Sequence, residues 1–429
     1  MVCAPCVRRG FFPLDEELGL VAGHFTPSVY EDITRFATWM PFGQAVKETG
    51  HFLHITLSEA TVRRQSEAVG AAYVAIQSAE VERLECGKNA EVVVGVLQQF
   101  MSVDGAFVPL VGGQWAEVKT LAIGTVQAPR EIKGERVIQT NELSYFSRLA
   151  EATTFQRLAL VETQRRGLTV SAAVAAVTDG AEWCQGFIDF HRSDAQRILD
   201  FPHAAEYVAT IGQTAFAADT AGQKQWLTEQ LHQLKHEGPA PVLAAAQKLA
   251  KEHPAQVELA KALTYLLKRE AQLDYPAFQA AGWPIADGAV ESANKLVVEN
   301  RLKGSGMHWA PVHVDPMLAL RNIACNDRWA EAWPLIHRQH RQQSAQQSTI
   351  RRQQRLANRR APVLLQPSLP LSSTKPVQEA ALPVLSTPLT APARPTDLPK
   401  TPYRPSASHP WRQPFLLKTK PQSVQTKPL

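Results

Sequence analysis

The C-terminal segment 338–429 limits how much of this 429-residue chain can fold around a core. Residues 338–360 hold seven arginines among glutamines and no acidic residue, and residues 361–429 contain 15 of the 30 prolines. A segment of this composition buries too little apolar surface to offset the conformational entropy that it loses on ordering. We therefore expect 338–429 to be a disordered, basic, proline-rich tail and the folded domains to lie within 1–337.

The net charge of +5 conceals two segments of opposite sign. Residues 1–337 hold 30 Lys and Arg against 38 Asp and Glu, whereas residues 338–429 hold 15 against two. A basic tail on an acidic body indicates a polyanionic partner. The sequence has no apolar run of 18 residues and no leader with a charged and then an apolar stretch. We therefore expect a cytoplasmic protein with no membrane span.

The five cysteines are odd in number and widely spaced, which favours reduced thiols over a disulfide framework. Only Cys3 and Cys6 form a motif, a Cys-x-x-Cys pair typical of half a structural zinc site. Four ligands are needed to close such a site, and His24 is the only nearby addition. The pair is a candidate Zn²⁺ site, but its ligand set is incomplete.

Residues 1–90 are expected to form a helical, DNA-binding region. Thr26-Pro27, followed by Glu31, gives a cap, a first-turn proline and a capping box. A second short helix is predicted over 41–48, with a break at Gly50. A third begins at Ser58, and its early turns carry the polar and basic side chains Thr61, Arg63, Arg64 and Gln65. This pattern resembles a helix-turn-helix unit whose last helix enters the major groove. The alternative is a solvated face on a small helical bundle.

Residues 91–337 are expected to form a mixed α/β sheet domain. Apolar runs predict strands at 92–96, 100–103, 118–126, 143–146, 174–177 and 198–199, with a Gly112-Gly113 turn before the third. Strands come first and then alternate with helices, which is typical of a mixed sheet. Residues 203–285 are rich in Ala, Leu, Gln and Lys. This stretch is predicted to be a helical insertion before the last helix of the domain.

Three acidic residues stand at positions where they could meet. Asp104 and Asp179 each end an apolar strand and precede a glycine, and Glu291 opens a helix with Lys295 one turn later. Carboxylates from separate elements are what two divalent cations need to hold the oxygens of an in-line phosphoryl displacement. Each acid alone has a simpler explanation. Asp-Gly is a common turn, and the helix dipole favours Glu in a first turn.

Seven segments together carry a more specific indication: Val103-Asp104-Gly105, Val118-Lys119, Arg165-Arg166-Gly167, Asp179-Gly180-Ala181-Glu182-Trp183, Ile198 to His203, Gly288 to Ser292 and Arg301 to Trp309. They resemble bacterial insertion-sequence transposases of the ISKra group, which are related to Mutator-like elements. The likeness covers about residues 3–337, and the block from Glu291 to Trp309 is its most specific part. It implies an RNase H-like, DDE-type catalytic domain interrupted by a helical insertion.

On this resemblance Asp104, Asp179 and Glu291 hold two Mg²⁺ or Mn²⁺ ions. Asp200 and His203 match an Asp-x-x-His element that supports the site or positions DNA. The alternative is that His203 caps or packs at a helix start.

Three cations on the last helix, Lys295, Arg301 and Lys303, would lie along the DNA path, where they neutralise phosphates. They could equally form a solvated helix face. The family usually has more sequence before the Cys3–Cys6 pair, so the resemblance also implies a truncated copy or a misassigned start.

The expected function is transposition in the bacterial nucleoid. The protein would bind the terminal inverted repeats of its element, nick the DNA with metal-activated water and use the exposed 3′-OH to attack target DNA. Because two ends are cut together, a homo-oligomer on DNA is expected, with the basic tail adding sequence-independent affinity. The alternatives are an RNase H-like nuclease or resolvase without strand transfer, and a decayed or domesticated DNA-binding protein.

Overall fold

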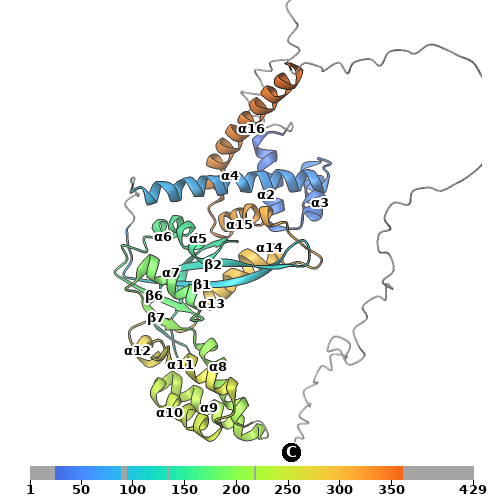
Figure 1. Cartoon of the computed structure of the whole chain (residues 1–429). Helices are drawn as coiled ribbons and strands as arrows, with labels where there is room; N and C mark the ends of the chain where they lie inside the picture. The colour runs from blue at the N-terminus through green and yellow to red at the C-terminus, as the bar shows by residue number, and fades with distance from the viewer. Residues whose placement is uncertain (1–24, 88–93, 133–134, 217–218, 361–429) are drawn as a thin grey trace, which may run out of the picture. The chain divides into compact units, whose positions relative to one another are not determined.

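A five-stranded mixed sheet forms the centre of the computed structural model (Figure 1), which describes residues 25–87, 94–132, 135–216 and 219–360. Its strands lie in the order β5-β2-β1-β6-β7. Their bounds are β1 (Gln98–Pro109), β2 (Trp115–Val126), β5 (Thr140–Arg148), β6 (Ala173–Thr178) and β7 (Gln196–Leu199). The pairs β1–β2 and β2–β5 are antiparallel, whereas β1–β6 and β6–β7 are parallel. The prediction of a mixed α/β sheet is therefore confirmed.

The long hairpin of β1 and β2 provides most of the sheet. It pairs continuously from Gln99 opposite Thr125 to Pro109 opposite Trp115. The chain reverses through Gly112 and Gly113, whose φ angles are +86° and +78°, as the predicted turn requires. A separate small hairpin, β3 (Arg130–Ile132) and β4 (Glu135–Val137), lies outside the main sheet.

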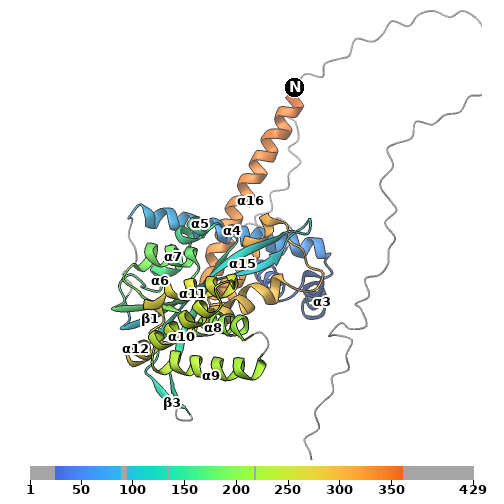
Figure 2. The same ribbon diagram turned by 60° about the horizontal axis from the view of Figure 1, so that its bottom comes forward.

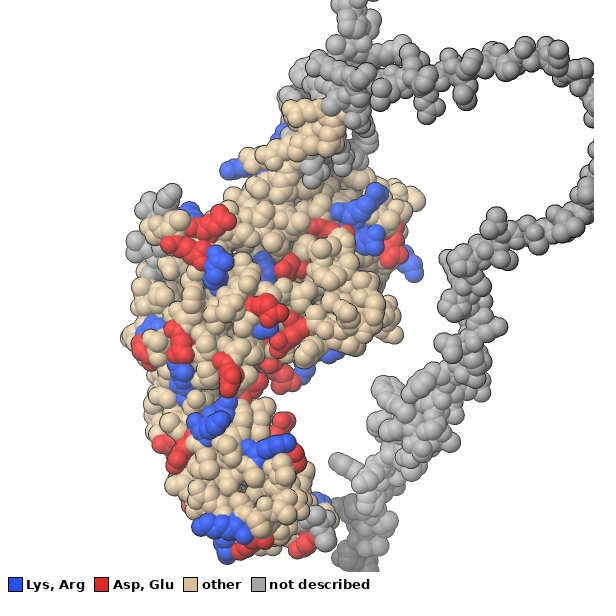
Figure 3. Space-filling model, viewed as in Figure 1, with Lys and Arg blue, Asp and Glu red and all other residues tan. Residues whose placement is uncertain are grey.

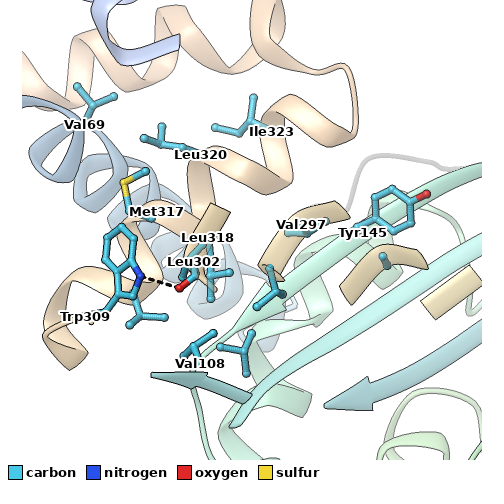
Figure 4. Packing of buried hydrophobic residues seen from close by; sticks show 14 of the residues in the cluster. Val69, Val108, Tyr145, Val297, Leu302, Trp309, Met317, Leu318, Leu320 and Ile323 are labelled. Atoms are coloured by element: carbon cyan, nitrogen blue, oxygen red, sulfur yellow. Dashed lines mark hydrogen bonds between the residues drawn. The ribbon is translucent and has the colours of Figure 1, made fainter. Parts of the chain in front are cut away.

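Alternate residues of β1 and β2 enter two different cores. Met101, Val103 and Leu121 pack on one face with α5 (Ala152–Leu158) and α7 (Glu182–Arg192), and α6 (Leu160–Arg165) follows α5. On the opposite face Val108 packs with the last helices of the domain (Figure 4). These are α13 (Gly288–Ala293), the π-helix η2 (Asn294–Glu299), α14 (Asn300–Leu302) and α15 (Pro311–Cys325). Both faces of the sheet are therefore covered.

The indole of Trp309 fastens the end of the last helices to the sheet. Its Nε1 donates to the Leu302 carbonyl at 2.9 Å, as Figure 4 shows. Its backbone N–H donates to the Pro109 carbonyl at the end of β1, and its own carbonyl accepts from Val111. The block from Glu291 to Trp309 is thus attached to β1 at Asp104, through Asn294, and at Pro109, through Trp309.

A group of helices is inserted between β7 and α13, as the sequence predicts. Helices α8 to α11 pack against one another in both views (Figure 1, Figure 2). The members are α8 (Phe201–Ala215), α9 (Thr220–His236), α10 (Pro239–Glu252), α11 (Val257–Leu267), η1 (Glu270–Gln272) and α12 (Tyr275–Ala280). Their apolar side chains share a core with Phe100, Val177 and Leu199 of the sheet, so the insertion is packed onto the strands.

The N-terminal helices are α2 (Pro27–Trp39), α3 (Phe42–Leu53) and α4 (Glu59–Glu85). The predicted caps are present, since Thr26 accepts from the Val29 N–H and Ser58 accepts from the Thr61 N–H. The predicted capping box is wrong, because Val29 is the third residue after the cap and Glu31 instead accepts from the indole of Trp329. The predicted break at Gly50 is wrong: α3 continues to Leu53, which packs with the N-terminal core, and ends where His54 adopts a left-handed φ of +55°. One glycine costs a helix only about 1 kcal/mol, so packing outweighs it.

Helix α4 is far longer than the short third helix that the sequence suggested. It packs against α15 and α16 (Trp329–Arg360) as well as α2 and α3. Where α4 crosses α15, a Cβ on Gly70 would stand 2.1 Å from the Pro316 carbonyl oxygen. Only a glycine allows the two backbones to approach this closely.

Two further predictions need correction. Val94, Gly95 and Val96 lie outside any strand; a Cβ on Gly95 would stand 2.2 Å from the Val170 carbonyl oxygen, and Val94 is exposed. Residues 338–360, expected to be disordered, continue α16, because Gln, Arg and Ala favour helices and no proline interrupts them. Residues 361–429 lie outside the described part. Within that part no helix combines the length and apolar character needed to cross a membrane.

Candidate active site

Asp104 and Asp179 lie at the same level on neighbouring parallel strands. Met101 of β1 pairs with Ala176 of β6, and each aspartate follows its paired residue by three positions. The proximity is electrostatic as well as geometric, because the Asp179 charge contributes to raising the pKa of Asp104. The structure therefore brings together the two aspartates that the sequence singled out. The prediction that Asp104 ends its strand is wrong, because β1 continues to Pro109 and Asp104 pairs with Thr120 of β2, whereas Asp179 directly follows the last residue of β6.

Asp104 is half-buried and held by an amide. Its Oδ2 accepts a hydrogen bond of 2.8 Å from Nδ2 of Asn294, the first residue of the π-helix. Burial raises the pKa of Asp104, and the charges of Asp179 and Glu117 raise it further, while the Gly105 N–H and Asn294 lower it. The net direction is upward, which is the behaviour expected of a carboxylate crowded by others.

Asp179 opens a turn whose backbone is clamped by the helical insertion. Its Oδ1 accepts from the Ala181 N–H at 2.9 Å, and its carbonyl oxygen accepts from the Tyr265 hydroxyl of α11. Arg269 donates through Nε to the Gly180 carbonyl at 3.1 Å. The insertion thus fixes the peptide that carries the second aspartate.

The thiol of Cys184, in α7, lies within hydrogen-bonding distance of both β1 and the Asp179 turn. This buried thiol lies 3.4 Å from Oδ1 of Asp179 and 3.6 Å from the Val103 carbonyl. Burial and the neighbouring Asp179 raise the pKa of this thiol, so it stays protonated and serves as a hydrogen-bond donor.

Glu291 contacts Lys295, one helical turn later in the chain, rather than the two aspartates. Its side chain is 63% exposed and forms an ion pair with Lys295. It nevertheless stands between Asp287 and Asn294 at spacings of four and three residues, which places all three on one face of the helix. Asn294 reaches Asp104 of β1 from that face.

Asp287 belongs to this site, although the sequence analysis gave it no role. Burial raises its pKa to about 8, and the charges of Asp200, Asp104 and Asp179 act in the same direction. The sequence did contain an indication, since Asp287 precedes a glycine as Asp104 and Asp179 do. Asp287 therefore lies close enough to Asp200, Asp104 and Asp179 for their charges to act on it.

The Asp-x-x-His element holds two helix starts together. Asp200 is buried; its Oδ2 accepts from the His203 N–H at 2.8 Å, and its Oδ1 accepts from the Asp287 N–H at 2.9 Å. The ring of His203 lies edge-on to Tyr207 and Tyr265, which stack at 3.9 Å. Asp200 thus caps α8 and positions the start of α13, while His203 packs against the tyrosine that holds Asp179.

The residues predicted to contact DNA do not all lie on the surface of the protein. Arg63 and Arg64 are exposed on the first turns of α4, and Lys303 pairs with Glu299 at 2.8 Å. Arg301 is 1% exposed and donates to the Ala37 carbonyl at 2.8 Å. Its predicted place along the DNA path is therefore corrected: the apolar spacing of the helix turns it inward, where it binds the C-terminal end of α2.

A cleft of about 560 Å³ lies beside the Asp179 turn, along one face of α11. Lys261, Lys268 and Arg269 supply cations to its wall, and Glu182 at the start of α7 is an acid in the same lining. Lys261 pairs with Glu258 at 2.8 Å. The cleft is therefore a cationic surface next to an acidic site.

Among the residues with described positions, no three His, Cys, Asp or Glu side chains converge closely enough to hold a metal ion as they stand. Cys3, Cys6 and His24 lie outside the described residues.

No family model matches the chain, and none of the curated proteins matches it either.

Proposed function

We propose that this chain is a DDE-type transposase that binds the inverted repeats of an insertion sequence, cuts the DNA and joins it to a target. The observation that carries the proposal is the proximity of Asp104, within β1, to Asp179, which directly follows the parallel strand β6, beside the helix of Glu291. A decayed copy would be under no constraint to keep these groups together.

The strand order supports an RNase H-like catalytic domain. Counted along the chain, the five strands of the sheet lie in the order third, second, first, fourth, fifth, with two antiparallel and two parallel pairs. A mixed sheet of this kind is compatible with the proposed RNase H-like fold. The helical insertion between β7 and α13 stands where the resemblance to transposases places it.

The residues present fit a pair of Mg²⁺ or Mn²⁺ ions. Hard divalent cations prefer oxygen ligands. Burial is the main cause that raises the pKa values of Asp104 and Asp287, and the charges of neighbouring carboxylates raise them further; a cation would relieve that repulsion. Asp104, Asp179 and Glu291 would hold the ions. When bound, these supply positive charge to the attacking and leaving oxygens of an in-line displacement.

The chain's own groups then position the carboxylates and the DNA. Glu291 has to leave its ion pair with Lys295 to join the two aspartates, and this frees the Lys295 ammonium for a phosphate. Asp200 keeps the start of α13 in place, and Tyr265 holds the Asp179 peptide. The insertion therefore acts as a support for the catalytic turn.

Local groups of cations, rather than one broad basic face, would bind the DNA. Figure 3 shows acidic and basic side chains interspersed over the viewed face of the body. The α11 cleft with Lys261 and Lys268, together with Arg63 and Arg64, offers such groups. Because two DNA ends are processed together, the active form is a homo-oligomer on DNA.

The test is incubation of the full chain with labelled DNA ends that flank its gene, in Mg²⁺, Mn²⁺ or EDTA. Metal-dependent nicking and joining, abolished in Asp104→Asn, Asp179→Asn and Glu291→Gln, is the expected result. Cutting without joined products would favour a nuclease or resolvase. Specific binding of the ends with no cutting in either metal would favour a non-catalytic DNA-binding protein and rule the transposase out.

A further inference from the structure

Asn294 occupies a distinctive position beside Asp104. Its Nδ2 donates to the Asp104 carboxylate at 2.8 Å, and its side chain is almost wholly buried, with 6% exposed. Its Oδ1 is buried without a hydrogen-bond partner among the described residues. The nitrogen of the amide is thus satisfied by the candidate site, whereas the oxygen next to it is not.

An unpartnered buried oxygen is costly. Leaving such an acceptor without a hydrogen bond destabilises a protein, and native structures contain few of them. An amide oxygen is also a hard ligand of the kind that Mg²⁺ and Mn²⁺ accept. A cation held by Asp104, or water bound to that cation, would satisfy this oxygen.

The local backbone places Asn294 there at an irregular point of the helix. After α13 the chain continues as the π-helix η2, which begins at Asn294. Single π-helical turns are rare and frequently lie at functional sites. The buried guanidinium of Arg321 donates to the carbonyls of Leu296 and Val297, so a neighbouring helix stabilises this turn.

We propose that Asn294 is a positioning residue of the metal site, which orients Asp104 through its amide nitrogen and takes the cation or its bound water as the partner of its amide oxygen. The inference rests on the proposed function, because it presupposes the cation. It adds a neutral oxygen to a set of carboxylates, so it supplies a ligand without adding negative charge.

The test measures Mn²⁺ binding to the full chain, without DNA, from the electron paramagnetic resonance signal of unbound Mn²⁺. Asn294→Ala should weaken Mn²⁺ affinity by about 10–100-fold, the usual effect of removing a group that orients a metal ligand. Asn294→Asp loses the hydrogen bond to Asp104 but puts a charged oxygen in place of the neutral one, where it can bind the cation directly, so it should bind Mn²⁺ at least as tightly as the wild type. Asn300→Ala, on the exposed side of α14, is the matched control and should bind as the wild type does.

Wild-type Mn²⁺ affinity in a folded Asn294→Ala variant would overturn the inference. If that variant does not fold, Asn294→Asp decides: Mn²⁺ should raise its melting temperature more than that of the wild type, and an equal or smaller rise overturns the proposal. If Mn²⁺ binding depends on Asn294 but the wild type never cuts DNA, the proposed transposase reaction is wrong and the role of Asn294 stands. If the wild type cuts DNA but Asn294→Ala binds Mn²⁺ with wild-type affinity, the role of Asn294 is wrong and the transposase reaction stands.

Discussion

At the scale of single residues, Gly180 is the position with the least freedom at the candidate site. Its φ is +79°, and an added Cβ would stand 2.6 Å from both the Tyr265 hydroxyl and Arg269 Nε. Gly180→Ala should therefore lower the free energy of unfolding by about 2 kcal/mol or more and displace the Asp179 turn. Urea unfolding measures the loss.

Gly112→Ala separates the two causes of that loss, which are backbone strain at a positive φ and steric overlap of the added Cβ with neighbouring atoms. Gly112 also has a positive φ, +86°, but nothing lies within 4 Å of its added Cβ. Its replacement should cost only the backbone strain, about 1 kcal/mol. Equal losses in the two variants would show that the clamp of Tyr265 and Arg269 is loose, contrary to the contacts described.

His191 provides a test of stability against pH. Its ring is buried against Phe187, and burial lowers its pKa from 6.5 to about 4. Because the folded-state pKa lies below the unfolded one, the contribution is present above pH 6.5 and is lost as the pH falls toward 4. The full loss is roughly 3 kcal/mol.

Chemical unfolding between pH 7 and pH 4 would measure this dependence. His191→Gln cannot titrate, so its stability should fall less steeply over that interval. His232→Gln, on the exposed side of α9, should follow the wild type. An unchanged slope in His191→Gln would show that other groups cause the acid sensitivity.

The sequence predicted the acidic residues of the site better than their neighbours. Asp104 and Asp179 could be found because each ends an apolar run and precedes a glycine. Asn294 and the buried Arg301 could not, because their roles depend on a π-helix and on packing against α2, which the local sequence does not encode. Glu291 was placed on the right helix, but its ion pair with Lys295 depends on the side-chain rotamer.

At the scale of elements, the crossing of α4 and α15 depends on Gly70. A Cβ there would stand 2.1 Å from the Pro316 carbonyl oxygen, and neither backbone can yield without separating the helices. Gly70→Ala should therefore destabilise the protein by about 1–3 kcal/mol, although alanine is the better helix former. Gly50→Ala in α3, whose Cβ would meet only an ordinary contact at 3.9 Å, should be neutral or stabilising in the same thermal unfolding. A stabilised Gly70→Ala would contradict the close approach.

The cleft along α11 predicts a local effect on DNA binding. Lys268 lines it, so Lys268→Glu should weaken binding of duplex DNA several-fold through the loss of phosphate contacts. Lys248→Glu, an exposed position on α10 outside the cleft lining, makes the same change of charge. Fluorescence anisotropy of labelled DNA compares them, and equal weakening would show that only net charge matters.

Helices and strands were predicted where local chemistry determines them. The Ser58 cap, the double-glycine turn and the apolar run at 118–126 all correspond to elements with those boundaries or close to them. The failures at Gly50 and Val94–Val96 arise from tertiary packing, which extends a helix past a glycine in one case. At Val94–Val96, packing replaces the predicted strand with contacts to the segment before β6.

At the scale of the whole molecule, the distribution of charge predicts how binding responds to salt. The chain divides into two units after Ala361, and residues 362–429 hold eight Lys and Arg against two acidic residues. Each phosphate that a cation neutralises contributes about 0.9 to the slope of log affinity against log salt. Deletion of 362–429 should therefore lower that slope, by about 3 if three phosphate contacts are lost, and weaken binding to unrelated DNA more than binding to the specific ends.

A variant that keeps the length of 362–429 but carries Gln in place of its eight Lys and Arg should behave as the deletion does, because the effect depends on charge. Titrations of DNA at several salt concentrations give both slopes. An unchanged slope in either variant would assign the non-specific affinity to the cations of residues 1–361, among which the exposed Arg338 and Arg341 of α16 would be the next to replace.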